Sequence, residues 1–451
     1  MADQNPLGIR KLPPWGRRGW GMILILLLFA GVLRGWRLSE PANLLGDELY
    51  YVAASRTYLL NVHDLNEEHP PLGKILIAAG IRLGQACESL SVEQLPSYGY
   101  IRLSSLLSGL GIVFFTFALA YRVSLGSLET AELAAFFVAS DFLSIIFSRL
   151  AMLDCMLSLW WLIGAYFGWL CLESIQNKGR YSWGLAAISA VAFSLAFATK
   201  WNGFVGGLVV YIFVVALSKG EAGKIDRKAQ AKKAALLFCL FFVIFSSLYM
   251  MSYLPQLFRE GFTTDTVLRI LHYPIQTWPG RNGENYMHPM SSPFWAWPIG
   301  LYPYIANITV EPDGTSCYLI YCGSIIFWWP GFYFVLKKFF ISWQPKDLAG
   351  LFVTSMWLGN WLFWIPFSSG GYIYYMLVGI PFMAIIMADA VQDLYVQKSY
   401  KLLCTYLFAI SVALSLYYPI LAYIPISKSM FNFLLPDWVS DLLAFIKVMI
   451  L

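Results

Sequence analysis

An adjacent pair of carboxylates, Asp47-Glu48, is the strongest candidate for chemistry in a chain of 451 residues that holds only 26 acidic ones. A carboxylate within hydrogen-bond reach of a hydroxyl group can remove its proton, and the neighbouring carboxylate, which projects elsewhere, could tie down the local backbone. The pair also suits the start of a helix, because Asp is a good N-cap residue and Glu favours the first turn. The pair alone leaves both interpretations open.

A second candidate is the run His69-Pro70-Pro71-Leu72-Gly73-Lys74. The paired prolines fix an extended backbone, so His69 and Lys74 are held in place. A lysine at this point can meet a phosphate as a point charge. It could equally be an interfacial lysine whose stem lies along apolar surface.

Four further charged residues lie at the ends of apolar stretches, namely Arg102, Arg149, Asp154 and Lys200. Charges within or beside hydrocarbon are costly, which makes each of them a functional hypothesis. Cations gathered beside carboxylates would suit an anionic lipid head group, whereas ion pairs that hold helix ends together are the structural alternative. The aromatic run 285–298 resembles an interfacial belt, and its His288 could help to shape a sugar or acceptor site.

The composition indicates the class of protein whose secondary structure must position these residues. Hydrophobic residues make up 59% of the chain, charged residues 13%, and the mean hydropathy is +0.62. Soluble domains carry roughly twice that charge, so a soluble enzyme, a disordered chain and a nucleic-acid binder are excluded, and the net charge of +5 is modest.

We predict an all-α polytopic membrane protein, since apolar stretches near the ~20 residues of a bilayer crossing recur along the chain. The first stretch is expected to be an uncleaved anchor, because no small-residue cleavage site follows it. The eleven predicted spans lie near residues 20–36, 100–121, 131–148, 152–172, 182–199, 202–218, 235–254, 318–336, 349–367, 371–391 and 402–424.

The distribution of Lys and Arg sets the predicted orientation. With the amino terminus inside, 18 of the 31 basic residues fall in inside segments, and the carboxyl terminus is outside. Two long outer segments, about 37–99 and 255–317, then carry the candidate chemistry. We expect one membrane domain over 1–425 and a short outer tail over 426–451.

Seven cysteines give no C-x-x-C pattern, so a metal or redox site is not expected. No metal-ligand spacing is evident, and the sequence predicts no cofactor while leaving a divalent-metal requirement open. A bridge between Cys317 and Cys322 also stays open.

Several motifs together resemble the protein O-mannosyltransferases, a family of the GT-C class of membrane glycosyltransferases. They occur in family order across most of the chain. The matching features are Asp47-Glu48, the run 69–74, Ser-Arg-x4-Asp at 148–154, residues 198–204, the His288-Pro289 run with its Trp-x-Trp-Pro, and Tyr374-Tyr375-Met376 with Pro381-Phe382.

This resemblance implies an enzyme that moves mannose from a polyprenyl (dolichyl-type) monophosphate carrier to Ser or Thr hydroxyls of exported proteins, inverting the anomeric centre. Its partners would be the lipid-linked sugar donor, the acceptor protein and membrane lipid. By motif position, Asp47 would be the base and Glu48 would orient the acceptor or the loop. The donor phosphate would be held by Arg149, Lys74, Lys200 and Arg102, and the supporting residues would be His69, Asp154 and His288.

Two departures from the family pattern are informative. The segment 255–317 is too short for the β-trefoil region of eukaryotic members, which points to the bacterial branch and to a plasma membrane with the site on its outer face, rather than to the endoplasmic reticulum. No cation precedes the late tyrosines in the run 367–372, where the family commonly has an Arg. The resemblance then implies that either another residue contacts the donor phosphate or the donor is a different one.

Two other functions would suit parts of the pattern. A related GT-C enzyme could transfer another sugar from polyprenyl phosphate to a lipid or glycan, in the style of the aminoarabinose transferases of lipid A. A transporter or flippase would line a pathway near mid-membrane with its charges, whereas the notable charges here gather on one side.

Overall fold

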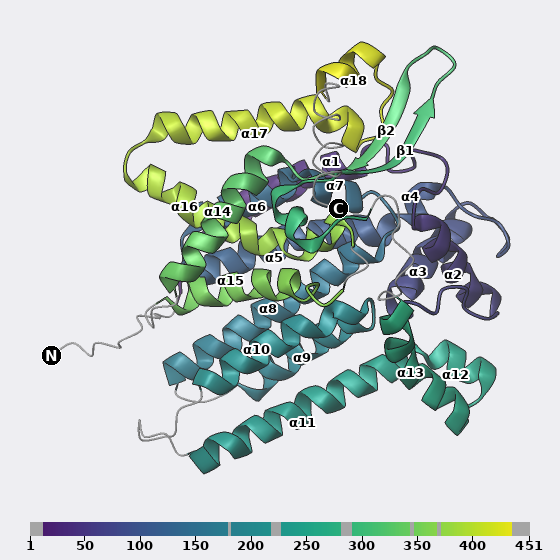
Figure 1. Ribbon diagram of the computed structural model, residues 1–451, viewed down its shortest axis with the longest axis horizontal. Coiled ribbons are helices and arrows are strands. Elements are labelled where there is room, and N and C mark those ends of the chain that lie inside the picture. Colours follow the sequence, from purple (N-terminus) through teal and green to yellow (C-terminus); the bar gives the residue numbers. More distant parts are fainter. Residues whose placement is uncertain are drawn as a thin grey trace.

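A computed structural model describes residues 12–178, 182–217, 227–280, 291–342, 347–367 and 371–434. Within these ranges the long helices pack side by side into one bundle (Figure 1). The bundle contains α1 (Gly16–Gly35), α5 (Leu103–Val123), α6 (Leu128–Ser140), α7 (Phe142–Phe147), α8 (Leu153–Lys178), α9 (Trp183–Phe197), α10 (Phe204–Leu217), α11 (Arg227–Ser252), α14 (Ile325–Ser342), α15 (Leu348–Leu362), α16 (Ile380–Val396) and α17 (Tyr400–Leu421).

Shorter elements complete the fold, most of them gathered at one end of the bundle, on the right in Figure 1. They are α2 (Glu48–Leu60), α3 (Leu72–Cys87), α4 (Tyr98–Ile101), η1 (Trp201–Gly203), α12 (Leu254–Glu260), α13 (Thr264–Gly280), η2 (Phe294–Ile299), β1 (Tyr304–Val310), β2 (Ser316–Tyr321), η3 (Ile373–Val378) and α18 (Lys428–Leu434). The two segments predicted to be long outer loops thus form helices and strands over much of their described length.

Each of the eleven predicted spans overlaps at least one of the bundle helices, the third overlapping both α6 and α7. Among the described residues, six helices are at least 18 residues long and apolar enough to cross a membrane. The polytopic helical fold class is confirmed, while the number of crossings stays a prediction. The short connection between α16 and α17, with Lys398 and Lys401, lies at the end of the bundle opposite to α2 and α3 (Figure 1). This arrangement agrees with the predicted segregation of basic connections from the outer segments.

The predicted third span is broken at Asp141, which lies in extended backbone between α6 and α7. Its carboxylate caps α7 by accepting a hydrogen bond from the Ser144 backbone N–H at 2.8 Å, and it accepts another from the Trp328 indole at 2.7 Å. A buried Asp that satisfies a helix start in this way ends the preceding helix. Hydropathy alone does not reveal such a break.

The predicted eighth span begins too early, because residues 316–321 form strand β2 and α14 starts only at Ile325. A short apolar run can belong to either a strand or a helix by its pattern. The strand pairs with β1 in an antiparallel hairpin that has an irregularity between Ile305 and Asn307. The all-α prediction therefore needs one correction, this hairpin.

The first part of the predicted tail packs onto the hairpin. Ile426 exchanges two backbone hydrogen bonds with Ser316, at 2.9 and 3.0 Å, and the Phe431 ring stacks on Tyr318 with centroids 3.9 Å apart. Residues 435–451 lie outside the described ranges. All seven cysteines are described and are free thiols, so Cys317 and Cys322 form no bridge with each other.

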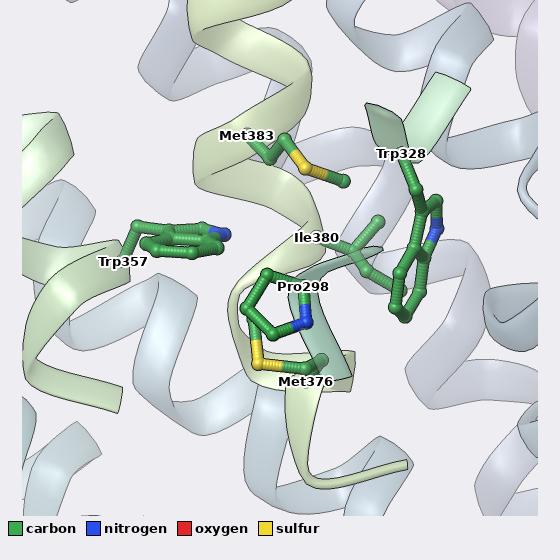
Figure 2. A pocket seen from close by; sticks show the side chains of 6 residues that line it. All are labelled: Pro298, Trp328, Trp357, Met376, Ile380 and Met383. Carbon is green, nitrogen blue, oxygen red and sulfur yellow. The ribbon is translucent and has the colours of Figure 1, made fainter. Parts of the chain in front are cut away.

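A small apolar pocket lies where η2, η3 and three bundle helices meet. Figure 2 shows its six lining side chains, which are Pro298, Trp328, Trp357, Met376, Ile380 and Met383. None of them is charged, so the pocket offers packing rather than chemistry. Its lining side chains bring η3, the segment that carries Tyr374, next to α14, α15 and α16.

Candidate active site

Asp47 lies immediately before α2 at one end of the bundle, and its carboxylate does not cap that helix. Instead the Tyr374 hydroxyl donates a hydrogen bond to Asp47 Oδ2 at 3.3 Å. The preceding Gly46 has a φ of +53°, and the Tyr321 hydroxyl lies 3.2 Å from the point where a Cβ would be. A glycine is needed here for both reasons, and it lets β2 and η3 approach the half-buried carboxylate.

Glu48 faces the other way and is fully buried. Its carboxylate pairs with Arg102 at 2.9 and 3.0 Å and accepts backbone N–H groups from Leu45 at 3.0 Å and Ala151 at 2.7 Å. The two adjacent acids therefore have different surroundings: Asp47 is half-buried beside tyrosines of β2 and η3, and Glu48 is enclosed.

Arg102 uses all five of its N–H donors inside this enclosure. Besides Glu48, it donates to the backbone carbonyl groups of Leu38, Pro41 and Asn43 at 2.9–3.1 Å. The side chain is 0% exposed. Arg102 thus ties the segment between α1 and α2 to the start of α5.

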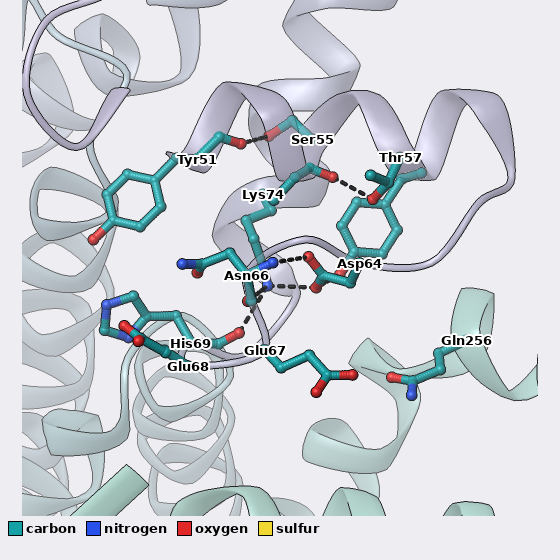
Figure 3. A network of polar contacts seen from close by, with 12 residues as sticks. Tyr51, Ser55, Thr57, Asp64, Asn66, Glu67, Glu68, His69, Lys74 and Gln256 are labelled. Atoms are coloured by element: carbon teal, nitrogen blue, oxygen red, sulfur yellow. Dashed lines mark hydrogen bonds and ion pairs between the residues drawn. The ribbon is translucent and has the colours of Figure 1, made fainter. Parts of the chain in front are cut away.

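Lys74 is likewise saturated, as Figure 3 shows. Its ammonium donates to Asp64 Oδ2 at 2.5 Å, to the His69 carbonyl at 2.8 Å and to the Asn66 carbonyl. These contacts fold the segment between α2 and α3 around the lysine. The His69 ring lies beside Tyr51 of α2, with centroids 5.7 Å apart.

Arg149 points toward the carboxyl end of α1. It donates to the carbonyl groups of Arg34 at 3.0 Å, Trp36 at 2.7 Å and Arg37 at 3.1 Å. A helix end leaves carbonyl groups without intrahelical partners, and Arg149 supplies donors for them. Its side chain is mostly buried.

Lys200 and Asp154 form the pair that lies beside Asp47. The Lys200 ammonium donates to both carboxylate oxygens of Asp154 at 2.9 Å. The same ammonium lies 5.6 Å from the ring centroid of Tyr374 and 5.5 Å from that of Tyr375. Tyr374 therefore contacts Asp47 through its hydroxyl and Lys200 through its ring, which places one carboxylate and one cation around a single side chain.

Two further tyrosines, both of the hairpin, lie near the Asp47 carboxylate. Burial raises the pKa of Tyr321 well above its ordinary value, and the carboxylates of Asp47 and Glu48 raise it further. Burial, followed by the Asp47 carboxylate, also raises the pKa of Tyr304. Both phenols therefore stay protonated as donors, and the buried Tyr321 hydroxyl has no hydrogen-bond partner among the described residues.

Of the residues singled out from the sequence, the structure thus brings Asp47, Asp154 and Lys200 together, and places Glu48, Arg102, Lys74 and Arg149 in the surrounding framework. His288 and residues 368–370 lie outside the described ranges. Sequence reasoning did not single out Tyr304, Tyr321 or, as a site residue, Tyr374. The only signal for Tyr374 was its place in a late aromatic run.

The fold is that of the GT-C membrane glycosyltransferases. The protein O-mannosyltransferase Pmt1-Pmt2 complex of S. cerevisiae, bound to its sugar donor, superposes with a TM-score of 0.76 at 12% identity, covering 94% of this chain and 92% of that one. ArnT of Cupriavidus metallidurans, bound to undecaprenyl phosphate, gives a TM-score of 0.55 at 16% identity, covering 95% of this chain and 73% of that one.

Within this class the sequence match is specific. Residues 24–256, just over half of the chain, match the family described as dolichyl-phosphate-mannose-protein mannosyltransferase, and the chain belongs to that family. The polyprenol-phosphate-mannose–protein mannosyltransferase of Mycobacterium tuberculosis is 24% identical over 93% of this chain and 92% of its own length. That of Mycolicibacterium smegmatis is 24% identical over 93% of both. The family predicted from the motifs is confirmed.

Proposed function

We propose that Asp47, Tyr304, Tyr321, Tyr374 and Lys200 border a crevice, and that this family member there transfers mannose from a polyprenyl phosphate carrier to a Ser or Thr hydroxyl of a protein. The observation that carries the proposal is the half-buried Asp47 carboxylate, which faces Tyr374 rather than its own helix and shares that tyrosine with the Lys200–Asp154 pair. A base and a cation then border one space, as the transfer requires.

In the proposed reaction, the acceptor oxygen bonds to the anomeric carbon of mannose from the face opposite to the carrier. Asp47 takes the hydroxyl proton. The bond between the anomeric carbon and the phosphate oxygen breaks, and its electron pair leaves with the carrier phosphate, so the anomeric centre inverts. Because the leaving group is already a phosphate, a nearby cation can stabilise its developing charge without a general acid.

We assign that cation to Lys200, whose ammonium lies among the crevice residues. The other cations receive positioning roles, since the donors of Arg102 and Lys74 are saturated and those of Arg149 hold the end of α1. Glu48 orients the loop that presents Asp47, and Asp154 orients Lys200. His69 supports the packing around Tyr51. His288 stays a predicted residue of the part of the site that binds the sugar or the acceptor.

The unpartnered Tyr321 hydroxyl supports the same assignment. A buried polar group without a partner is costly, and this one lies beside Gly46 and within the field of Asp47. A hydroxyl of the bound sugar or acceptor would satisfy it. The described part of the chain contains no cluster of metal-ligating side chains.

The location of the site is also a proposal. The chain is an integral multi-pass membrane protein, and the positive-inside pattern supports a position of the crevice on the non-cytoplasmic face. The short second outer segment supports a bacterial-type plasma membrane. Labelling of Asp47→Cys and Lys398→Cys from outside intact cells should modify the first and spare the second; the reverse result would contradict this orientation.

The test of the function uses purified enzyme, polyprenyl-phosphate mannose and a Ser/Thr-rich peptide. Asp47→Asn should lower turnover by at least about 100-fold, the lower range for loss of a general base. Asp393→Asn, at an exposed position on α16, is the matched control and should keep wild-type activity. A wild-type enzyme that labels lipid or glycan but no peptide would favour the alternative sugar transferase, and an active Asp47→Asn variant would remove the base assignment.

A further inference from the structure

The hairpin that borders the crevice has one strand with an unpaired edge. Strand β1 runs over Tyr304–Val310 and pairs only with β2 among the described residues. Its sequence, YIANITV, contains no charged residue and no proline. Exposed strand edges are usually blunted by such residues, because an open edge is a template for another extended chain.

The turn geometry shows which backbone groups point to that edge. Glu311 donates its N–H to the Thr315 carbonyl at 2.8 Å, so this pair is a hydrogen-bonded one. Bonded and non-bonded pairs alternate along an antiparallel ladder. The pairs Ile308–Tyr318 and Val310–Ser316 are therefore the non-bonded ones, and Ile308 and Val310 turn their N–H and carbonyl groups away from β2.

An independent contact confirms this alternation. Ser316, the partner of Val310 in the register, exchanges both of its backbone hydrogen bonds with Ile426 on the opposite side of β2. No described residue supplies a backbone partner to Ile308 or Val310. Their side chains are 51% and 70% exposed, so the edge is open in this part of the chain.

This edge leads into the candidate active site. Its first residue, Tyr304, stacks on Tyr321 with ring centroids 5.2 Å apart, and Asp47 raises the pKa of both phenols. Ile308 and Val310 lie four and six residues further on, which is about 13 and 20 Å along an extended strand. A chain paired with them would enter the crevice after a similar number of its own residues.

We propose that the acceptor polypeptide binds as an added strand along the edge of β1, with main-chain hydrogen bonds to Ile308 and Val310 and its acceptor hydroxyl in the crevice beside Asp47. This inference rests on the proposed function and adds to it the mode of acceptor recognition. Backbone pairing gives affinity with little dependence on sequence, while the exposed Ile308 and Val310 side chains favour apolar or β-branched neighbours on the same face of the acceptor.

The direct test needs no variant of the enzyme. A series of acceptor peptides, each with one backbone N-methyl group placed two to eight residues from the Ser, is assayed for KM with wild-type enzyme. Each lost hydrogen bond should raise KM by about 2- to 10-fold, at every second position only. A KM that is flat or that rises without this period of two overturns the proposal.

Variants of Ile308 then test whether the acceptor strand pairs with β1 at this residue. Ile308→Pro removes the outward N–H on an edge strand, where proline is tolerated, and Ile308→Thr keeps that N–H and the β-branch. Only the proline variant should raise KM for the long peptide, because it lacks the N–H that bonds to a carbonyl of the acceptor. A peptide with two residues on either side of its Ser, too short to reach Ile308, should be mannosylated equally by all three enzymes, which also checks that the variants fold.

The outcomes separate the two proposals. A wild-type enzyme that mannosylates neither peptide overturns the proposed function and this inference together. Mannosylation of both peptides with no alternation overturns only the inference. Cross-linking of Ile308→Cys chains to one another in membranes, unaffected by the long peptide, would identify a second copy as the occupant of the edge and would also overturn it.

Discussion

Two buried carboxylate–cation pairs lie at the same end of the bundle, and they differ in what surrounds the cation. In both Glu48–Arg102 and Asp154–Lys200 the charged atoms lie 2.9 Å apart. Each cation also lies over an aromatic ring, Tyr98 for Arg102 and Tyr374 for Lys200. The Arg102 guanidinium has all five donors bonded to Glu48 and backbone carbonyl groups, whereas among the described residues the hydrogen bonds of the Lys200 ammonium go to Asp154 alone. By charge and burial alone the two pairs would receive the same role.

The difference teaches that the hydrogen-bond partners of the cation separate a pair proposed to be structural from one proposed to be functional. A cation whose donors all end on a buried carboxylate and on backbone carbonyls holds a loop and has none left for a ligand. The Lys200 ammonium, whose hydrogen bonds among the described residues go to Asp154, lies beside the aromatic rings of the proposed site. The first pair should therefore control folding, and the second should control turnover.

The largest effect is expected from breaking the enclosed pair. Arg102→Ala leaves the Glu48 carboxylate buried without its partner and frees three carbonyl groups, so it should destabilise the fold by about 3–5 kcal/mol. The thermal midpoint of the purified protein in detergent measures this loss. The exposed Arg82→Ala is the control, and equal midpoints for both variants would contradict the structural assignment of Arg102.

The second pair should respond in activity instead. In the double variant Asp154→Asn/Lys200→Met both charges are removed, so no buried charge is left alone and the thermal midpoint should stay close to that of the wild type. Turnover should fall by about 100-fold or more, in the range for a lost electrostatic stabiliser. Full turnover with polyprenyl-phosphate mannose would exclude Lys200 from the site.

A smaller effect is expected at the tyrosine that connects the crevice residues. Tyr374→Phe keeps the ring over Lys200 and removes only the hydrogen bond to Asp47. Loss of one such bond to a charged group should lower kcat by about tenfold, with little change in KM for the lipid donor. A change in donor KM with an unaltered kcat would place Tyr374 on the donor rather than on the base.

The smallest effect belongs to a partly exposed group of three charged residues, which completes the comparison. Lys338 contacts Asp389 at 2.8 Å and Asp347 at 3.1 Å, and its side chain is 29% exposed. Lys338→Ala should cost at most about 1 kcal/mol of stability and leave turnover unchanged. A loss as large as that of Arg102→Ala would show that burial is not what distinguishes the pairs.

Much of the fold follows from the sequence, because length and hydropathy define membrane helices directly. The break at Asp141 and strand β2 were missed for a common reason: each depends on a partner far along the chain, Trp328 in one and β1 in the other. Periodicity within a segment carries no information about such partners.

For the site, residue type and motif order identified Asp47, Asp154 and Lys200, which the structure brings together. The same reasoning grouped Arg102, Lys74 and Arg149 with them, since a cation at a helix end looks alike whether its donors face a phosphate or a carbonyl. The alternative of structural pairs, which the sequence left open, describes Arg102 well. Tyr321 could not be predicted, because its place beside Gly46 arises from the hairpin.

The hydrogen bond between Tyr374 and Asp47 joins residues 327 positions apart in the chain. During biosynthesis, the amino-terminal part that carries Asp47 emerges and inserts long before Tyr374 is made. The contact between Tyr374 and Asp47 therefore cannot form until nearly the whole polypeptide has been inserted into the bilayer. A product that ends before Tyr374 would lack the residue that contacts Asp47, so in the proposed mechanism the order of synthesis itself keeps partly made chains from transferring mannose.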